Sequence, residues 1–202
     1  MSQLSHAAEH PPTTTGLDHR KMVMWAFLGS DCLFFGSLIA TYLLYKGKSL
    51  VGPYPADVFN IPYTSVSAFV LLMSSLTMVL ALAAIQRGDQ RGLRIWLAAT
   101  ALLGAIFIGG QYFEFITFYH NGLGLTTNLF GTTFYVLTGF HGAHVTFGII
   151  ILLSFLVMSF RGRVAPEQHL NIELAGLYWH FVDVVWIVIF TVIYLVEAPN
   201  IV

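Results

Sequence analysis

Five long apolar runs set the limits on what this chain can fold into. They cover roughly residues 22–45, 62–86, 93–119, 131–160 and 171–196. A membrane-spanning helix needs about 20 mostly apolar residues, because each residue rises about 1.5 Å through about 30 Å of hydrocarbon. Every run meets that length. The sequence therefore predicts an all-α fold, a polytopic membrane protein built as a bundle of five transmembrane helices.

The segments between the runs have compositions that interrupt membrane helices. Residues 46–62 hold three prolines and two lysines, residues 86–92 read QRGDQRG, and residues 161–170 combine charge with proline. Such clusters mark turns and loops. We expect a single five-helix domain over residues 22–202, preceded by a polar N-terminal tail over residues 1–21.

The composition excludes several classes of function. Only 9% of the residues are charged and the formal net charge is −1, so no basic surface indicates a nucleic-acid partner. A soluble domain typically carries about 25% charged residues. The single cysteine, Cys32, excludes an internal disulfide and any cysteine-based metal cluster.

Lysine and arginine are distributed unevenly between the two sides of the predicted bundle. If the runs cross in alternation, the N-terminal tail, the 86–94 turn and the 161–170 loop share one side. That side holds Arg20, Lys21, Arg87, Arg91, Arg94, Arg161 and Arg163, against Lys46 and Lys48 on the other. Positive residues are enriched on the cytoplasmic side. We therefore expect a cytoplasmic N-terminus and a C-terminus outside.

Polar side chains inside the apolar runs are the candidate functional residues, because a charge in the membrane costs several kcal/mol unless it is paired or faces a cavity. They are Asp31, Gln111, Glu114, His141, His144, His180 and Asp183. At helical spacing, the first two of these histidines share a face. Counting from the run ends places most of the set near the midplane. We expect a buried polar network, with Asp31 either protonated or hydrogen-bonded to His141 or His144.

Three interpretations of this network remain open on the residues alone. The first is structural: hydrogen bonds fix the helices, and small residues allow close helix approach. The candidate glycines are Gly29, Gly36, Gly104, Gly109, Gly110, Gly139, Gly142 and Gly148. The second is a metal or haem site, since two histidines at i, i+3 with a third on another helix can ligate iron or copper. The third is a proton path through a stand-alone carrier.

The sequence resembles subunit III of the haem–copper terminal oxidases, the cytochrome c and quinol oxidases. The shared motifs are Ser30-Asp31-x-x-Phe34-Phe35, Gly110-Gln111 with Glu114, Phe140-His141-Gly142-x-His144-Val145, and Tyr178-Trp179-His180-Phe181-Val182-Asp183-Val184-Val185-Trp186. Their order and spacing fit the family from about residue 20 to 196. Longer family members have seven spans, and this chain corresponds to the last five, as in a short bacterial form.

The resemblance implies an accessory, non-catalytic subunit in the bacterial plasma membrane. Its complex would reduce dioxygen to water and pump protons, with cytochrome c or quinol as electron donor. Haem and copper would lie in the partner catalytic subunit, subunit I, alongside subunit II and small subunits. This chain would hold no catalytic, cofactor-binding or metal-binding residue. It would bind phospholipid, with Arg161 as a candidate headgroup contact because Met158 stands at the family's usual arginine position. A stand-alone proton-coupled carrier is the alternative.

Overall fold

The computed structural model describes residues 18–50, 52–53, 59–165 and 169–196. In chain order the elements are α1 (His19–Tyr45), α3 (Ile61–Gln86), α4 (Gln90–His120), α5 (Leu129–Phe160), α6 (His169–Phe190) and a π-helical turn, η2 (Thr191–Leu195). The part of the chain described here contains no strand. Five helices, the last of them running on through η2, are long and apolar enough to cross a bilayer. The predicted all-helical, five-span fold is confirmed; residues 1–17 and the C-terminal residues 197–202 lie outside the described ranges.

The helices begin one to three residues before the apolar runs, because polar residues cap and open them. Asp18 accepts a 2.8 Å hydrogen bond from the backbone N–H of Arg20, so α1 already starts at His19, inside the predicted tail. Asp89 bonds Gly92 N at 2.9 Å and Asn128 bonds Gly131 N at 2.7 Å in the same way. These caps satisfy N–H groups that have no partner within the helix.

The turn after α3 is tight because its glycine adopts a left-handed backbone. Gly88 has φ +74° and donates a 2.9 Å hydrogen bond to the carbonyl of Ile85. This is the conformation that ends many helices and that side chains other than glycine rarely adopt. The chain therefore reverses within three residues, and α3 and α4 pack side by side.

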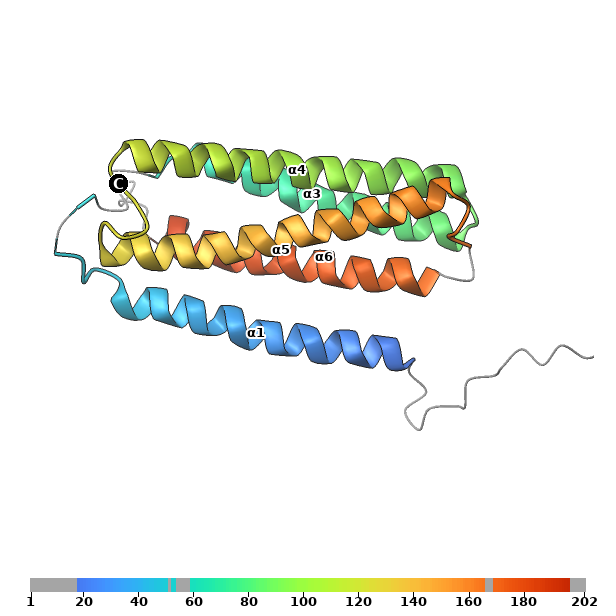
Figure 1. Cartoon of the computed structure of the whole chain (residues 1–202), viewed down its shortest axis with the longest axis horizontal. Helices are drawn as coiled ribbons and strands as arrows, with labels where there is room; N and C mark the ends of the chain where they lie inside the picture. The colour runs from blue at the N-terminus through green and yellow to red at the C-terminus, as the bar shows by residue number, and fades with distance from the viewer. Residues whose placement is uncertain (1–17, 51, 54–58, 166–168, 197–202) are drawn as a thin grey trace, which may run out of the picture.

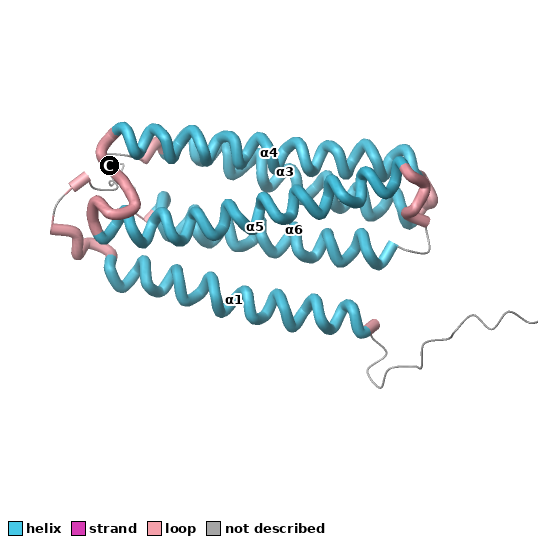
Figure 2. Tube along the Cα trace, in the orientation of Figure 1, coloured by secondary structure: helices cyan, strands magenta, loops and turns pink. Residues whose placement is uncertain are grey.

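Four helices form a bundle, and the fifth lies against its side (Figure 1). α3 packs on α4 and α6, α4 on α5, and α5 on α6, whereas α1 packs along α5 and α6. Figure 2 shows the same arrangement as a trace, with the connecting loops at the two ends. The chain direction reverses from each helix to the next, as alternate crossings require.

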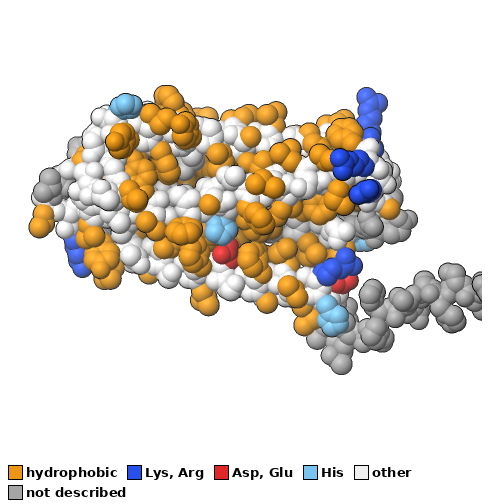
Figure 3. All heavy atoms as spheres, viewed as in Figure 1, with side chains coloured by type: hydrophobic (Ala, Val, Ile, Leu, Met, Phe, Trp, Pro, Cys, Tyr) orange, Lys and Arg blue, Asp and Glu red, His pale blue; other side chains and the backbone are white. Residues whose placement is uncertain are grey.

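On the face seen in Figure 3, hydrophobic side chains run along the length of the bundle, and lysine and arginine side chains lie at its two ends. We call the end at which α1 begins and α5 finishes the basic end, because Arg20, Arg87, Arg91 and Arg161 lie there. Arg94, also at this end, donates to the carbonyl of Ser159 at 2.8 Å and so closes α4 on α5.

Trp179 is the centre of the packing between four helices. A side chain at Gly104 on α4 would come within 2.6 Å of the Trp179 ring, and one at Gly148 on α5 within 2.9 Å. The indole N–H of this α6 residue donates to Ser74 Oγ on α3 at 2.9 Å. Two of the candidate glycines thus permit close approach. Gly29, Gly36, Gly109 and Gly139 instead face open space.

Candidate functional site: polar side chains between the helices

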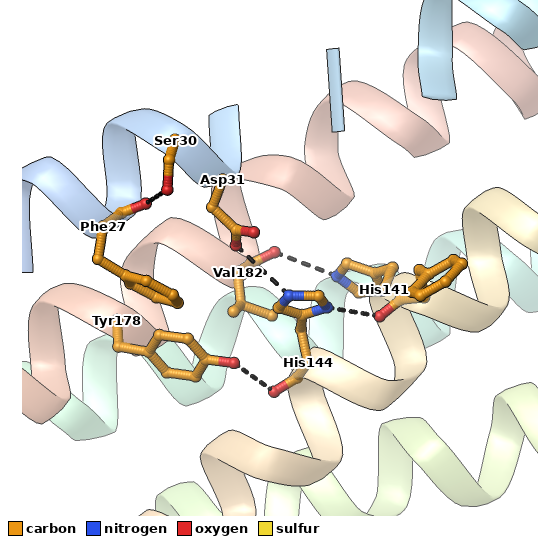
Figure 4. A network of polar contacts seen from close by, with 8 residues as sticks. Phe27, Ser30, Asp31, His141, His144, Tyr178 and Val182 are labelled. Atoms are coloured by element: carbon orange, nitrogen blue, oxygen red, sulfur yellow. Dashed lines mark hydrogen bonds and ion pairs between the residues drawn. The ribbon is translucent and has the colours of Figure 1, made fainter. Parts of the chain in front are cut away.

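Asp31 and His144 face each other where α1 meets α5. Asp31 Oδ2 lies 3.5 Å from His144 Nε2, which is an ion-pair distance rather than a well-formed hydrogen bond. The other ring nitrogen, Nδ1, lies 2.7 Å from the carbonyl oxygen of Phe140 one turn earlier on α5. Figure 4 shows the ring between these two oxygen partners. In Figure 3 an acidic side chain and a histidine adjoin midway along the apolar surface.

This geometry determines which ring nitrogen of His144 carries a hydrogen. A carbonyl oxygen can only accept, so Nδ1 of His144 carries the hydrogen of that bond. In a neutral ring Nε2 then bears a lone pair, and a carboxylate opposite it would set two acceptors against each other. A hydrogen bond between the facing atoms would thus need a proton on Asp31 or on Nε2 of His144, and at 3.5 Å none is formed.

His141 is turned toward α6 instead. Its ring is fully buried, and Nε2 donates to the carbonyl oxygen of Val182 at 3.1 Å. The ring packs on Trp186 with centroids 4.9 Å apart and meets the edge of Phe107. Figure 4 shows the two histidines of α5 directed to different helices. Residues three apart on a helix differ by about 60° around its axis, which here divides them between α1 and α6.

Tyr178 completes the junction of α1, α5 and α6. Its hydroxyl donates to the backbone carbonyl of His144 at 3.0 Å, and its ring stacks with Phe27 of α1 at 6.3 Å between centroids. Figure 4 shows both contacts beside the Asp31–His144 pair. One tyrosine of α6 thus touches both of the other helices.

A second polar group ties α3 to α4. Glu114 is buried, its Oε1 accepts from the Thr64 hydroxyl at 2.7 Å, and its Oε2 accepts from the Gln111 amide at 3.2 Å. Both carboxylate oxygens are therefore hydrogen-bonded by neutral donors.

A third polar group lies between α3 and α6. Asp183 is 4% exposed, and its Oδ2 accepts from the Ser75 hydroxyl at 2.6 Å. His180, one turn earlier on α6, is half-buried, and the Asp183 carboxylate is its electrostatic neighbour.

Six of the seven residues selected from the sequence thus lie in three separate polar groups, and His141 lies apart from them against α6. Among the described residues, the direct contacts within the set are Asp31 with His144 and Gln111 with Glu114. The remaining hydrogen bonds go to Ser75, Thr64 and the backbone carbonyls of Phe140 and Val182. The sequence did not predict the serine and threonine partners, because these residues are common in membrane helices. Arg161, the proposed headgroup contact, is exposed where α5 ends.

A metal site requires several ligating side chains that converge on one point. In residues 18–50, 52–53, 59–165 and 169–196, no group of three or more His, Cys, Asp or Glu side chains is placed to hold a metal ion. Each of the two histidines of α5 uses one ring nitrogen to donate a hydrogen bond to a backbone carbonyl.

Comparisons with known proteins agree on one family. A family model described as cytochrome c oxidase subunit III matches residues 15–198. The cytochrome c oxidase subunit 3 of Thermostichus vulcanus is 39% identical over 193 residues, covering 95% of this chain and 92% of the relative. That of Bacillus sp. (strain PS3) is 40% identical over 171 residues, covering 85% and 83%. The quinol oxidase subunit 3 of Bacillus subtilis (strain 168) is 39% identical over 171 residues, covering 85% and 84%.

Proposed function

The chain belongs to the cytochrome c oxidase subunit III family, and from this we infer that it stabilises its oxidase as a scaffold of helices and lipid and carries no electrons itself. It is an accessory subunit of a haem–copper terminal oxidase, and so part of an oxidoreductase complex of the respiratory chain. It is a multi-pass protein of the bacterial membrane. Family membership favours this role over the alternative of a stand-alone proton-coupled carrier.

The observation that carries the scaffold role is the set of contacts made by the intramembrane polar residues. Glu114 is bonded on both oxygens by Thr64 and Gln111, and His141 bonds a carbonyl of the neighbouring helix. Interhelical hydrogen bonds of this kind hold membrane helices together at about 0.6–2 kcal/mol each. The polar side chains therefore act as tethers between helices, and an electron carrier is not needed to explain them.

We expect other subunits of the complex to determine whether the electron donor is cytochrome c or quinol. Relatives named for cytochrome c and relatives named for quinol are equally similar to this chain. That equality supports a role common to both oxidase classes, away from the donor site. We therefore propose that this chain contacts the catalytic subunit, subunit I, directly, and that subunit I holds the haems and copper together with subunit II and small subunits of the same complex.

A phospholipid is the proposed small-molecule partner. A groove of about 250 Å³ runs between α1, α5 and α6, lined chiefly by Phe27, Phe147, Phe155 and Tyr178. A second hollow shares Phe27 and reaches Arg20 at the basic end. An acyl chain fits the aromatic walls, and a phosphate fits the arginine. Arg161 offers a second cation at the same end of the bundle.

The test is to purify the oxidase through an affinity tag on its catalytic subunit and to compare it with the tagged chain expressed alone. The complex should contain this chain and show haem absorbance, whereas the isolated chain should contain neither haem nor stoichiometric iron or copper. A haem spectrum from the isolated chain would contradict the scaffold role. Absence of the chain from the purified oxidase would contradict membership of the complex.

A further inference from the structure

His180 lies on the outer face of α6, well inside the membrane span. It stands about 16 Å along the helix axis from the start of α6 at His169. Its side chain is half-buried rather than enclosed. Within the described part of the chain the imidazole makes no hydrogen bond, and the charge acting on it comes from Asp183.

Asp183 has spare hydrogen-bonding capacity at nearly the same depth. Its Oδ2 atom accepts from Ser75, but its Oδ1 atom is buried without a hydrogen bond to any described residue. A buried carboxylate oxygen and a histidine ring, both lacking hydrogen bonds, therefore lie one turn apart on α6. The Asp183 oxygen is enclosed by this chain, so His180, which is partly exposed, is the group of the two that an outside partner can reach. A polar ring is expensive in hydrocarbon and normally faces a protein partner or water.

The residues around this pair are exposed and apolar. On α6 the exposed fractions of Val184 and Ile187 are 57% and 45%, and these residues follow His180 at helical spacing. On α3 the exposed fractions of Leu72 and Leu76, which flank Ser75, are 42% and 54%. We call these four residues with Ser75 and His180 the α3–α6 face. In Figure 1, α3 and α6 are the helices behind α4 and α5.

We propose that the α3–α6 face docks a transmembrane helix of a partner subunit, and that this helix presents a hydrogen-bonding side chain to His180. A lipid does not meet the requirement, because acyl chains neither donate nor accept hydrogen bonds and headgroups remain at the membrane surface. A protein helix supplies both the apolar contact and the polar group at this depth. This inference rests on the proposed function, since it assumes a complex, and it identifies the face through which the chain joins it.

Photo-crosslinking in the intact, co-purified oxidase tests the face. A photoreactive phenylalanine analogue is placed at Val184 or Ile187, and at Leu102 of α4 as the matched control. Leu102 is 62% exposed, and α4 packs against α3 and α5. Adducts to another oxidase subunit are expected from the two α6 positions and not from Leu102. Loss of the chain from the complex with both α6 variants, but not with Leu102, supports the same conclusion.

The proposal is overturned if Val184 and Ile187 yield only lipid adducts, or if the subunit adduct comes from Leu102 instead. Because the wild-type chain must co-purify first, failure of this inference is distinguishable from failure of the proposed function.

Substitution of His180 tests the polar contact separately. His180→Phe keeps an aromatic ring but removes both ring nitrogens, whereas His180→Gln keeps a donor and an acceptor. Loss of one interhelical hydrogen bond should weaken retention of the chain in detergent about three- to fifteenfold for His180→Phe. His180→Gln should restore most of the retention. Equal retention in wild type and both variants would refute a partner hydrogen bond at this position.

Discussion

Oδ2 of Asp31 on α1 lies 3.5 Å from Nε2 of His144 on α5, whose other ring nitrogen donates to the carbonyl of Phe140. This contact joins the least buried of the five helices to the rest of the bundle. A similar attachment occurs at the basic end, where Lys21 Nζ lies 2.6 Å from Glu173 Oε1 of α6. α1 is thus held by polar contacts at two depths.

The first prediction concerns the contact between Asp31 and His144. Asp31→Asn places an amide N–H opposite His144 Nε2, so the contact and the assembled oxidase should survive. Asp31→Leu leaves the ring nitrogen without a partner and should destabilise the chain by roughly 1–2 kcal/mol. Thermal unfolding and subunit retention measure the difference. Initial oxygen reduction should be normal in both variants. If Asp31→Asn abolished the first turnovers of an assembled complex, the carboxyl would belong to the chemistry and the scaffold role would fail.

The second prediction compares two glycines of α4. A Cβ at Gly104 would lie 2.6 Å from the Trp179 ring, so Gly104→Ala should destabilise the bundle by about 1–3 kcal/mol. Gly109 has no atom within 4 Å of the same position, so Gly109→Ala should be neutral or slightly stabilising. Thermal unfolding of the purified complex checks both. Equal effects would mean that Trp179 moves aside without cost.

The number of helices was predictable because the thickness of the bilayer sets a minimum length for a membrane-spanning helix. All five apolar runs reach that length. The starts were less accurate, because Asp18, Asp89 and Asn128 extend each helix beyond its apolar part. The close approaches at Gly104 and Gly148 could not be separated from the open positions at Gly29 and Gly139. Whether a glycine contacts a tryptophan depends on how the helices are rotated, which a single sequence does not specify.

The third prediction is the orientation of the chain. The basic end should face the cytoplasm, because positive residues are retained there during insertion. A reporter placed in the 86–92 turn should be active in the cytoplasm, and one fused after Val202 should be active outside. Both reporters active on one side would refute this topology.

The fourth prediction tests the lipid contact of Arg161. Arg161→Gln removes a cation at the end of α5 and should lower the phospholipid content of the purified oxidase, measured by mass spectrometry of extracted lipids. Arg163→Gln is the matched control, since both arginines are exposed in the same loop. Equal lipid content in the two variants and the wild type would exclude Arg161 as a headgroup contact.

The polar residues show where sequence reasoning reaches its limit. Their position inside apolar runs identified these side chains as candidate functional residues. Their similar depth in the membrane suggested that they would contact one another. In the structure Asp183 meets Ser75, and Glu114 meets Thr64. A hydroxyl carries no charge, and serine and threonine are common in membrane helices, so the sequence gives no sign of these partners.

The placement of α1 has a consequence for synthesis. α1 leaves the ribosome before the other described helices, yet it packs against α5 and α6, which follow α3 and α4 in the chain. Asp31 therefore enters the membrane well before His144 exists, and the nascent helix must hold an unpaired carboxyl in lipid for most of translation. Protonation of that carboxyl is the simplest way to keep the helix inserted while it waits. The order of the chain thus leaves the first span without its neighbouring helices until α5 has been made.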